Sequence, residues 1–415
     1  MTCVMSLFTP SRSLSQSEFV ALIAILMAMV GMSVDSMLPA MGIIATELGA
    51  AEPNDRQLIL STLFGGLTLG LWFYGPLSDA IGRRRALVLG LVLFVAGSLL
   101  CAMATSFPML LAGRLLQGFG AAGPRIVSVA MVRDLHAGRS MARIMSIAMS
   151  IFILVPVFAP AIGQGVLLVA SWRVIFAGLG VMGLIAFIWF MARQPETLKP
   201  ENRRPFTPGG LWRAVWEVAG NRVTLGYIFA TGAIFGAFIG YLNSTQQIFA
   251  EAYGLGAAFP LYFGSLAAGF GVASLVNARL VMKFGMQYLS VRAGIVLSVI
   301  AVALLVTELI LGSLPPLWLF MGAFGAIFFC AAILFGNYNA LAMEPMGHIA
   351  GSASAIIGTA TTGLSLLVGT VIGQAYDGTA LPVAIGFASM GMAAVAAQNW
   401  AETGRTKLAA IKPAR

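Results

Sequence analysis

Apolar residues occur along the chain in long runs that are separated by short polar segments. A helix needs about 20 mostly apolar residues to cross the hydrocarbon core of a membrane. Twelve runs of this kind lie near 18–41, 58–77, 86–105, 108–132, 143–165, 172–192, 223–247, 258–281, 289–312, 317–341, 351–375 and 381–400. The pattern therefore predicts an all-α membrane protein with twelve transmembrane helices.

The longest polar stretch, residues 193–222, divides these helices into two sets of six, and its four prolines favour a linker. The segment APAIGQG (159–165) is echoed by GTVIGQA (369–375) about half the chain later. Repeated halves are typical of transporters that bind their substrate between the repeats. We expect two pseudo-symmetric six-helix bundles, and the full order is a tail (1–17), a bundle (18–192), the linker (193–222), a bundle (223–400) and a tail (401–415).

Composition supports a membrane protein and argues against a soluble one. Hydrophobic residues make up 59% of the 415 residues, and charged residues only 9%. A soluble domain is about 25% charged, because its surface must face water. The net charge of +9 does not indicate a nucleic-acid partner. The basic residues lie in short loops between apolar runs and form no stripe with interleaved aromatic side chains.

The basic residues also predict the orientation of the chain in the membrane. Lys and Arg gather in the two tails and in every second loop, whereas the alternate loops hold only Arg56 and Arg173. Loops rich in Lys and Arg stay on the cytoplasmic side. We therefore expect both termini to be cytoplasmic.

Few residues offer enzymatic or metal-binding chemistry. Cys3, Cys101 and Cys330 have no disulfide or metal-ligand spacing, and His136 and His348 both fall in predicted loops. The sequence shows no His/Glu cluster and no nucleophile beside a base, so it offers no groups for acid–base or nucleophilic catalysis. The sequence also contains no ATP-binding phosphate loop. We expect a secondary transporter rather than an enzyme, with no metal and no cofactor.

The loop between the second and third runs carries the most distinctive motif, GPLSDAIGRRR (75–85). Gly75 and Gly82 permit a tight turn, and Asp79 is placed to pair with an arginine or to cap a helix. A plain cytoplasmic anchor would explain the arginines but neither Asp79 nor the glycines. The motif resembles the loop signature of the major facilitator superfamily, which implies the twelve-helix fold of that family. The residues that the resemblance assigns to a conformational latch in this region are Gly75, Asp79, Gly82, Arg83, Arg84 and Arg133.

Two further stretches resemble motifs of the same family. GRLLQGFG (113–120), in the fourth run, is similar to a motif associated with proton coupling. PVFAPAIGQ (156–164), in the fifth run, is similar to an antiporter motif, with Ala159 and Gln164 where glycine is usual. The antiporter resemblance falls on Pro156, Pro160 and Gly163.

Pieces spread over most of the chain resemble the Bcr/CflA branch of drug-resistance transporters. They include SVDSMLPAM (33–41), SWRVIF (171–176), PETLKPENRRPF (195–206) and GHIAGSASA (347–355). The resemblance implies export of antibiotics and related small molecules in exchange for protons. It also implies a monomer in the bacterial inner (plasma) membrane, with the proton gradient as energy source.

Two charged residues inside the apolar runs are candidates for proton coupling. Asp35 and Arg114 each lie about six residues from the outer end of their run, so both should sit about 9 Å below the outer surface. Equal depth makes them candidate neighbours. In one interpretation Asp35 carries the coupling proton and Arg114 tunes and competes for it. In the other, the two form a permanent ion pair that only fixes helix packing.

Other polar residues in the runs are candidates for lining a substrate cavity. Arg125, after Pro124, is expected either to contact substrate or to bond backbone carbonyls freed by the proline, while Glu308 is expected to be solvated at a membrane surface. For each of the remaining candidates, helix packing or solvation at a helix end is the alternative to substrate contact. They are Gln117, Tyr241, Asn243, Gln246, Gln247, Asn337 and Tyr338.

The function predicted from these features is proton-coupled export of small amphipathic compounds by alternating access. The first alternative is a symporter or facilitator for a small metabolite, which an additional coupling acid in the second half would have favoured. A different class is a membrane sensor that does not transport, but the sequence shows no added soluble output domain. The expected partners are the substrate, the proton and the lipid bilayer.

Overall fold

The structure, a computed structural model, describes residues 14–203 and 208–411. The chain forms two compact units, Met1–Pro208 and Gly209–Arg415. The division falls within the stretch 193–222 that the sequence indicates as a linker. Residues 1–13 of the predicted first tail and 412–415 of the second lie outside the described residues.

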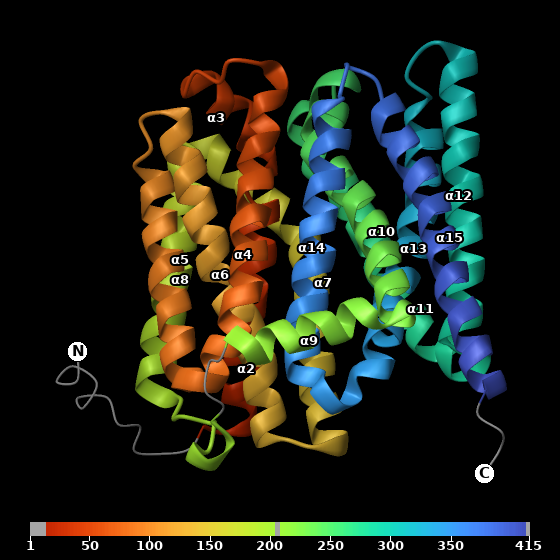
Figure 1. Ribbon diagram of the computed structural model, residues 1–415. Coiled ribbons are helices and arrows are strands. Elements are labelled where there is room, and N and C mark those ends of the chain that lie inside the picture. Colours follow the sequence, from red (N-terminus) through yellow and green to blue (C-terminus); the bar gives the residue numbers. More distant parts are fainter. Residues whose placement is uncertain (1–13, 204–207, 412–415) are drawn as a thin grey trace. The chain divides into compact units, whose positions relative to one another are not determined.

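Unit 1 is a bundle of long antiparallel helices joined by short turns (Figure 1). Its helices are α2 (Gln16–Asp35), α3 (Met41–Glu47), α4 (Leu58–Ile81), α5 (Arg83–Ala102), α6 (Phe107–Leu135), α7 (Gly138–Val169) and α8 (Arg173–Arg193). Short 3-10 turns lie at η2 (Leu38–Ala40), η3 (Pro53–Gln57) and η4 (Pro200–Asn202). Helix α6 packs along both α4 and α5.

Close packing of α4 against α6 depends on two glycines that face each other's backbone. A Cβ atom on Gly66 would lie 2.0 Å from the Leu115 carbonyl oxygen, and one on Gly118 would lie 2.0 Å from the Leu63 carbonyl oxygen. Helices in a membrane gain little from burying apolar surface against each other, so they rely on close van der Waals contact. The glycines permit that contact here.

Unit 2 is a second bundle of long helices, preceded by one short helix (Figure 1). The helices are α9 (Pro208–Gly220), α10 (Arg222–Gln246), α11 (Phe259–Phe284), α12 (Met286–Leu311), α13 (Leu317–Met343), α14 (Ala350–Gln374) and α15 (Leu381–Ile411). Irregular turns follow α10 at η5 (Gln247–Ala252) and η6 (Gly256–Ala258), and α13 at η7 (Glu344–Ile349).

A stripe of glycines four residues apart on α10 receives side chains four residues apart on α14. A Cβ on Gly232, Gly236 or Gly240 would lie within 2.6 Å of Leu364, Val368 or Ile372, respectively. Small residues at this spacing let two membrane helices approach closely. The glycines of α10 therefore permit close packing against α14.

The described residues contain eleven segments that are long and apolar enough to cross a membrane. One of them, Leu317–Gln374, has 58 residues and holds both α13 and α14, so the predicted twelve long helices are all present. No β-strand occurs in residues 14–203 or 208–411. The all-α prediction is confirmed.

The first and last helices differ in extent from the predicted runs. The first run, 18–41, is not one helix, because α2 ends at Asp35 and the chain turns before η2 and α3. Helix α15 continues to Ile411, whereas the sequence indicates a tail from 401. Hydropathy marks where a helix can leave lipid, but the helix itself ends where its last backbone groups find other partners.

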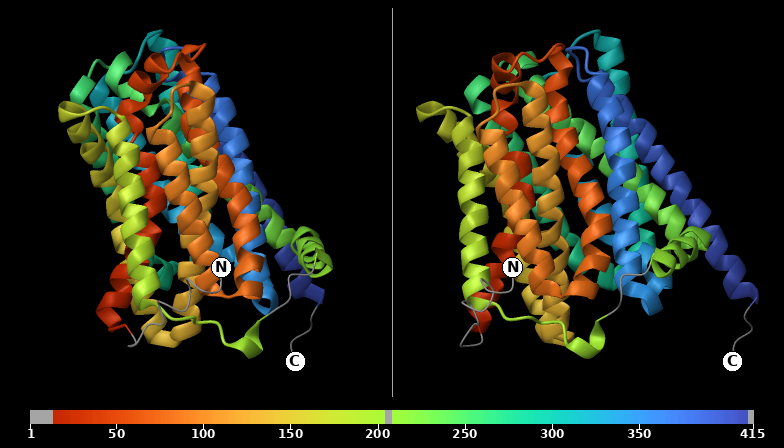
Figure 2. Two further views of the ribbon diagram at one scale, coloured as in Figure 1. Left: turned by 90° about the vertical axis from the view of Figure 1, so that its left-hand side faces the viewer. Right: turned by 60° about the vertical axis from the view of Figure 1, so that its left-hand side comes forward.

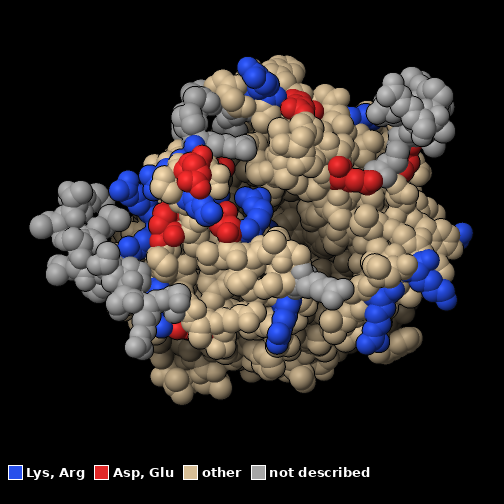
Figure 3. Space-filling view, turned by 90° about the horizontal axis from the view of Figure 1, so that it is seen from below, with Lys and Arg blue, Asp and Glu red and all other residues tan. Residues whose placement is uncertain are grey.

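Charged side chains are concentrated at the ends of the helices. Figure 3, seen from below the view of Figure 1, shows Lys and Arg side chains, several with Asp or Glu nearby, on a face formed mostly by other residues. The flanks of the helices are apolar. For example, Val181, Leu275 and Val299 are 56%, 65% and 61% exposed. Such side chains are suited to face lipid.

Candidate functional site

The end of α2 places Asp35 at an interruption in the first membrane segment. Asp35 is the last residue of α2, and Ser36 closes the helix by donating its backbone N–H to the Met32 carbonyl at 3.2 Å. Pro39 is the second residue of the following 3-10 turn, where its ring cannot continue an α-helix. The Asp35 side chain is therefore held at a helix end, and the residue is 4% exposed.

Arg114 of α6 is fully buried and binds three neighbours. Its Nε donates to the Ile59 carbonyl and one terminal nitrogen donates to the Ser33 carbonyl, both at 3.0 Å. The other terminal nitrogen donates to Gln117 Oε1 at 2.7 Å. The guanidinium thereby joins α6 to the end of α2 and the start of α4.

Asp35 and Arg114 are brought to the same end of unit 1 but not into contact. Arg114 reaches the Ser33 carbonyl, two residues before Asp35. Among the residues that the structure describes, the Asp35 carboxylate has no hydrogen-bond or ion-pair partner. The alternative of a permanent ion pair is therefore not what holds these helices together, and backbone carbonyls take its place.

The antiporter-like motif of α7 packs onto the helix that carries Asp35. A Cβ on Gly163 would lie 1.8 Å from the Ser36 carbonyl oxygen, next to Asp35 in the chain. One turn away, Ala159 packs in a small buried cluster with Ala28 of α2 and Val155 of α7. Pro156 and Pro160 stand inside the same helix. The motif thus sets the distance between α7 and the end of α2.

Arg125 lies eleven residues beyond Arg114 on α6, about 16 Å further along the helix axis. It is half-buried, and the described part of the chain offers its side chain no hydrogen-bond or ion-pair partner. The carbonyl bonding expected around Pro124 is not formed. A cationic side chain without a protein partner inside a membrane segment is available to a ligand or water.

Most of the other cavity candidates make contacts within their own unit. Gln117 donates to Ser98 Oγ at 2.8 Å, Asn243 donates to the Gly369 carbonyl at 3.2 Å, and Asn337 exchanges hydrogen bonds with Asn277. Tyr338 donates to Gln398 Oε1 at 3.0 Å.

The three candidates at the end of α10 are also engaged. Gln246 donates to Glu251 at 3.3 Å, and Gln247 begins the turn η5. Tyr241 is buried against Phe324 and Phe328 at ring distances of 5.3 and 4.9 Å. Packing is thus the role that the structure supports for these residues.

The expectation that Glu308 is solvated is wrong. The residue is 2% exposed, and its Oε1 accepts the backbone N–H of Ala380 at 2.8 Å. The carboxylate joins the end of α12 to the turn before α15. The sequence could not indicate this because Ala380 is distant in the chain.

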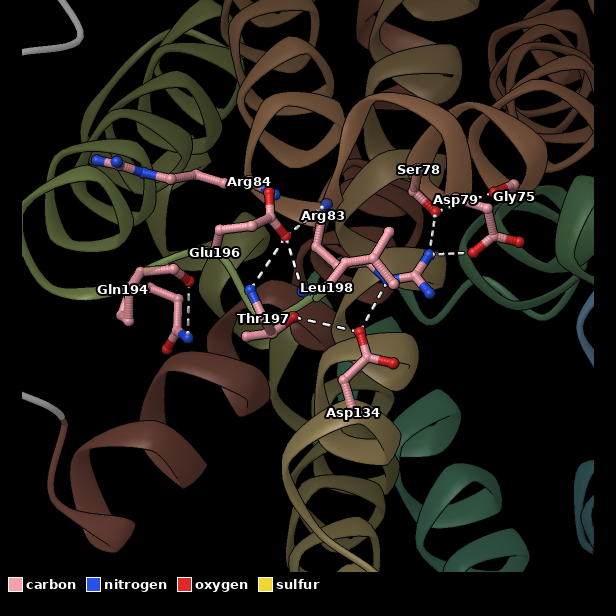
Figure 4. A network of polar contacts seen from close by, with 11 residues as sticks. Gly75, Ser78, Asp79, Arg83, Arg84, Asp134, Gln194, Glu196, Thr197 and Leu198 are labelled. Carbon is pink, nitrogen blue, oxygen red and sulfur yellow. Dashed lines mark hydrogen bonds and ion pairs between the residues drawn. The ribbon is translucent and has the colours of Figure 1, made fainter. Parts of the chain in front are cut away.

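The predicted latch forms a network at the junction of α4 and α5 (Figure 4). Arg83 donates to Asp79 at 2.5 Å, to Ser78 Oγ at 2.8 Å and to Asp134 of α6 at 2.9 Å. Its side chain is only 5% exposed. Three helix ends are thereby joined through one guanidinium.

Glu196, which follows α8, closes the same network. Its carboxylate accepts the backbone N–H groups of Arg83 and Arg84 at 2.9 and 3.1 Å (Figure 4). These N–H groups open α5, where a negative charge is favoured. Gly82 has a φ of +99°, and a Cβ there would lie 2.3 Å from Glu196 Oε2. Glycine is therefore required at this turn.

Two members of the network were missed in the sequence, and one predicted member lies outside it. Asp134 directly follows Arg133, and Glu196 lies in the family-like segment PETLKPENRRPF, but neither is among the predicted site residues. Arg133 is exposed and makes no contact with the network. Of the other predicted members, Arg84 donates to the Met191 carbonyl at 2.9 Å, and the Gly75 carbonyl accepts from Ser78.

Glu196→Ala should destabilise unit 1 by about 1–2 kcal/mol, because it removes both the cap and the charge at the start of α5. Thermal unfolding of the purified protein measures the loss. Glu201→Ala is the matched control, since Glu201 is an exposed carboxylate five residues later. Equal melting temperatures for the two variants would contradict a capping role for Glu196.

Comparison with known proteins gives one consistent answer. The family model described as Major Facilitator Superfamily matches residues 22–370. A Bacillus subtilis protein named as an uncharacterized MFS-type transporter, YdgK, is 32% identical over 346 residues, covering 82% of this chain and 84% of that protein. A Haemophilus influenzae protein named as a bicyclomycin resistance protein homolog is 28% identical over 369 residues, covering 88% and 91% of the two chains.

Among solved structures, the xylose transporter XylE from E. coli is similar with a TM-score of 0.69 and 14% sequence identity. The match covers 92% of this chain and 96% of XylE. At this identity the likeness concerns the fold alone. It agrees with the twelve-helix prediction.

Proposed function

Because the chain belongs to the major facilitator superfamily and is thus a multi-pass membrane transporter rather than an enzyme, we propose that it exports small amphipathic drugs or antibiotics in exchange for protons. The family model spans most of both units. Members of this family move small molecules across a membrane, and the proposal specifies the direction of transport, the coupling ion and the class of compound.

Support for export comes from the relatives. The name of the Haemophilus influenzae relative describes resistance to bicyclomycin, an antibiotic, and other relatives are named multidrug resistance protein MdtL. Resistance by a transporter requires that the compound leave the cell. We carry this direction over to the present chain as part of the proposal.

The observation that supports proton coupling is the burial of the Asp35 carboxylate without a partner among the described residues. A carboxylate that is 4% exposed and lacks a partner among the described residues is costly in its charged form. Binding a proton removes the charge, and binding a cationic or hydrogen-bonding compound offsets it. Proton and compound then compete for one group, and competition of this kind produces exchange in alternating access.

In the proposed mechanism, Arg114 supplies a fixed positive charge at the end of α2 that carries Asp35. Its guanidinium is held on the Ser33 and Ile59 carbonyls, so it stays in place whether Asp35 is charged or neutral. Arg125 is the proposed substrate contact, because its side chain has no partner among the described residues. The proton gradient drives the cycle, and no cofactor takes part.

The network around Arg83 is the proposed latch for one state of the cycle. It ties the ends of α4, α5 and α6 through Asp79, Arg83 and Asp134. Breaking these contacts would free the three helix ends to move together. On the positive-inside pattern, this end of the protein and both termini face the cytoplasm. The resemblance to Bcr/CflA transporters favours a monomer in the bacterial inner membrane.

Everted membrane vesicles test the exchange directly. After respiration has acidified the vesicle lumen, an exported compound added outside should enter the lumen and release protons, which a ΔpH-sensitive dye reports. Chloramphenicol-like and bicyclic antibiotics are the first compounds to try. Vesicles without the protein are the control. Compound and protons moving in the same direction would refute antiport and favour the symporter alternative.

A further inference from the structure

The short helix α9 lies crosswise to the long helices of unit 2, near their lower ends in Figure 1. The first view of Figure 2 shows the same helix nearly end-on beside the long helices of this unit. Only Asn221 separates it from α10, and the Asn221 side chain caps α10 by accepting the Thr224 N–H at 3.0 Å. The end of α9 is thereby held at the point where a membrane-spanning helix begins.

One side of helix α9 is buried in the protein, and the opposite side is exposed. Ala214 and Val218 are 7% and 2% exposed, whereas Trp212 and Trp216 are 60% and 62% exposed. At about 100° per residue these two pairs stand on opposite sides of the helix. The two indole rings pack edge to face, with their centroids 5.7 Å apart. The small side chains of the helix are thus buried, and its two tryptophans are exposed.

We infer that the face of α9 formed by Trp212 and Trp216 binds the phospholipids of the leaflet in which α10 begins. Two indoles in water would leave a large apolar surface exposed. Tryptophan favours the boundary between headgroups and acyl chains, where the ring is buried and its N–H stays near polar groups. A helix with one apolar face lies in that boundary, with its apolar face about 5–10 Å deep.

The surface beside α9 supports lipid as the occupant. Trp400 of α15 is 45% exposed. Arg222 places its guanidinium 4.9 Å from the Trp400 ring and donates to the Trp400 carbonyl at 2.8 Å. Paired tryptophan and arginine side chains are typical of the membrane surface. The α9 face therefore continues the lipid-facing surface of unit 2.

Charge at α9 also favours a phospholipid. Arg213, between the two tryptophans in sequence, is exposed and can reach headgroup phosphates. On another part of the helix, Glu217 contacts His348 of η7, which ties α9 to the turn between α13 and α14. The inference needs only a protein that spans the membrane, and it holds whether or not the transporter exchanges protons.

Quenching of tryptophan fluorescence tests the inference in the full-length protein reconstituted in phospholipid vesicles. The emission of the two residues is the difference between the wild type and the Trp212→Phe/Trp216→Phe variant, which leaves the buried Trp172 intact. Vesicles of phosphatidylcholine brominated near the headgroup end of the acyl chain should reduce this difference to about half or less. Aqueous iodide should leave it nearly unchanged.

Two controls make the result decisive. Trp318, which is 75% exposed at the first turn of α13, is the control for an exposed tryptophan outside α9. Its emission is the difference between the wild type and the Trp318→Phe variant. Lipid brominated at the chain terminus should quench Trp212 and Trp216 less than lipid brominated near the headgroup. Strong quenching by iodide without quenching by brominated lipid would overturn the inference, because the face would then lie in water or await a soluble partner.

Discussion

Asp35→Asn is expected to abolish proton-coupled export and to leave the folded protein intact. Asparagine has nearly the shape of aspartate but neither takes up nor releases a proton. It also removes a buried carboxylate that has no partner among the described residues, so thermal stability should be equal or higher. In energised everted vesicles, proton release on addition of compound should fall to the level of vesicles without the protein.

Asp377→Asn is the control for this variant. Asp377 is an exposed aspartate whose carboxylate accepts, among the described residues, only from the nearby Thr379. Its export should equal that of the wild type. Downhill movement of compound, measured without a proton gradient, separates lost coupling from lost transport. Full proton-driven export by Asp35→Asn would refute the role proposed for this residue.

Gly163→Ala is expected to disrupt the packing of α7 on α2. The new methyl group would lie 1.8 Å from the Ser36 carbonyl oxygen, so the two helices must separate by more than about 1 Å. Overpacking against a rigid backbone costs about 1–3 kcal/mol or more. Because Ser36 follows Asp35, export should fall together with the melting temperature of the purified protein.

Gly165→Ala provides a closely matched control on the same helix. A Cβ at Gly165 meets nothing within 4 Å, and alanine has the higher helix propensity. This variant should unfold at the same temperature as the wild type or slightly above it, and should export normally. If both variants behaved alike, the close approach of α7 to Ser36 would not matter for stability.

The transmembrane helices could be predicted from the sequence because an apolar run of sufficient length must be helical in lipid, where each backbone polar group needs a partner within the segment. Their ends were harder to predict. The first run breaks after Asp35, where Pro39 is the visible signal. The extension of α15 to Ile411 has no hydropathy signal, because that part of the helix continues beyond the apolar run.

The candidate site could be predicted only in part. Counting residues placed Asp35 and Arg114 at one depth, and Arg114 does reach the end of α2. The count could not show that carbonyls, rather than Asp35, would bind the guanidinium. Carbonyl groups are present in every residue and give no signal in the sequence. Their availability depends on where α2 ends and where α4 begins.

The network at Gly82 could likewise be predicted only in part from the sequence. Glycine and arginine at this loop indicated a tight, basic turn, and the turn is present. Glu196 is 113 residues from Arg83, and only the folding of α8 beside α5 brings its carboxylate to the two N–H groups that open α5. A cap supplied from a distant segment follows no local spacing rule.

The length and spacing of the apolar runs were enough to predict the fold class and the division into two bundles. The sequence also indicated which charged residues lie within the membrane segments. Which of those charged groups bind a protein partner could be seen only once the helices were packed. Partner choice depends on distances of about 3 Å between groups far apart in the chain, and such distances are set by helix packing rather than by composition.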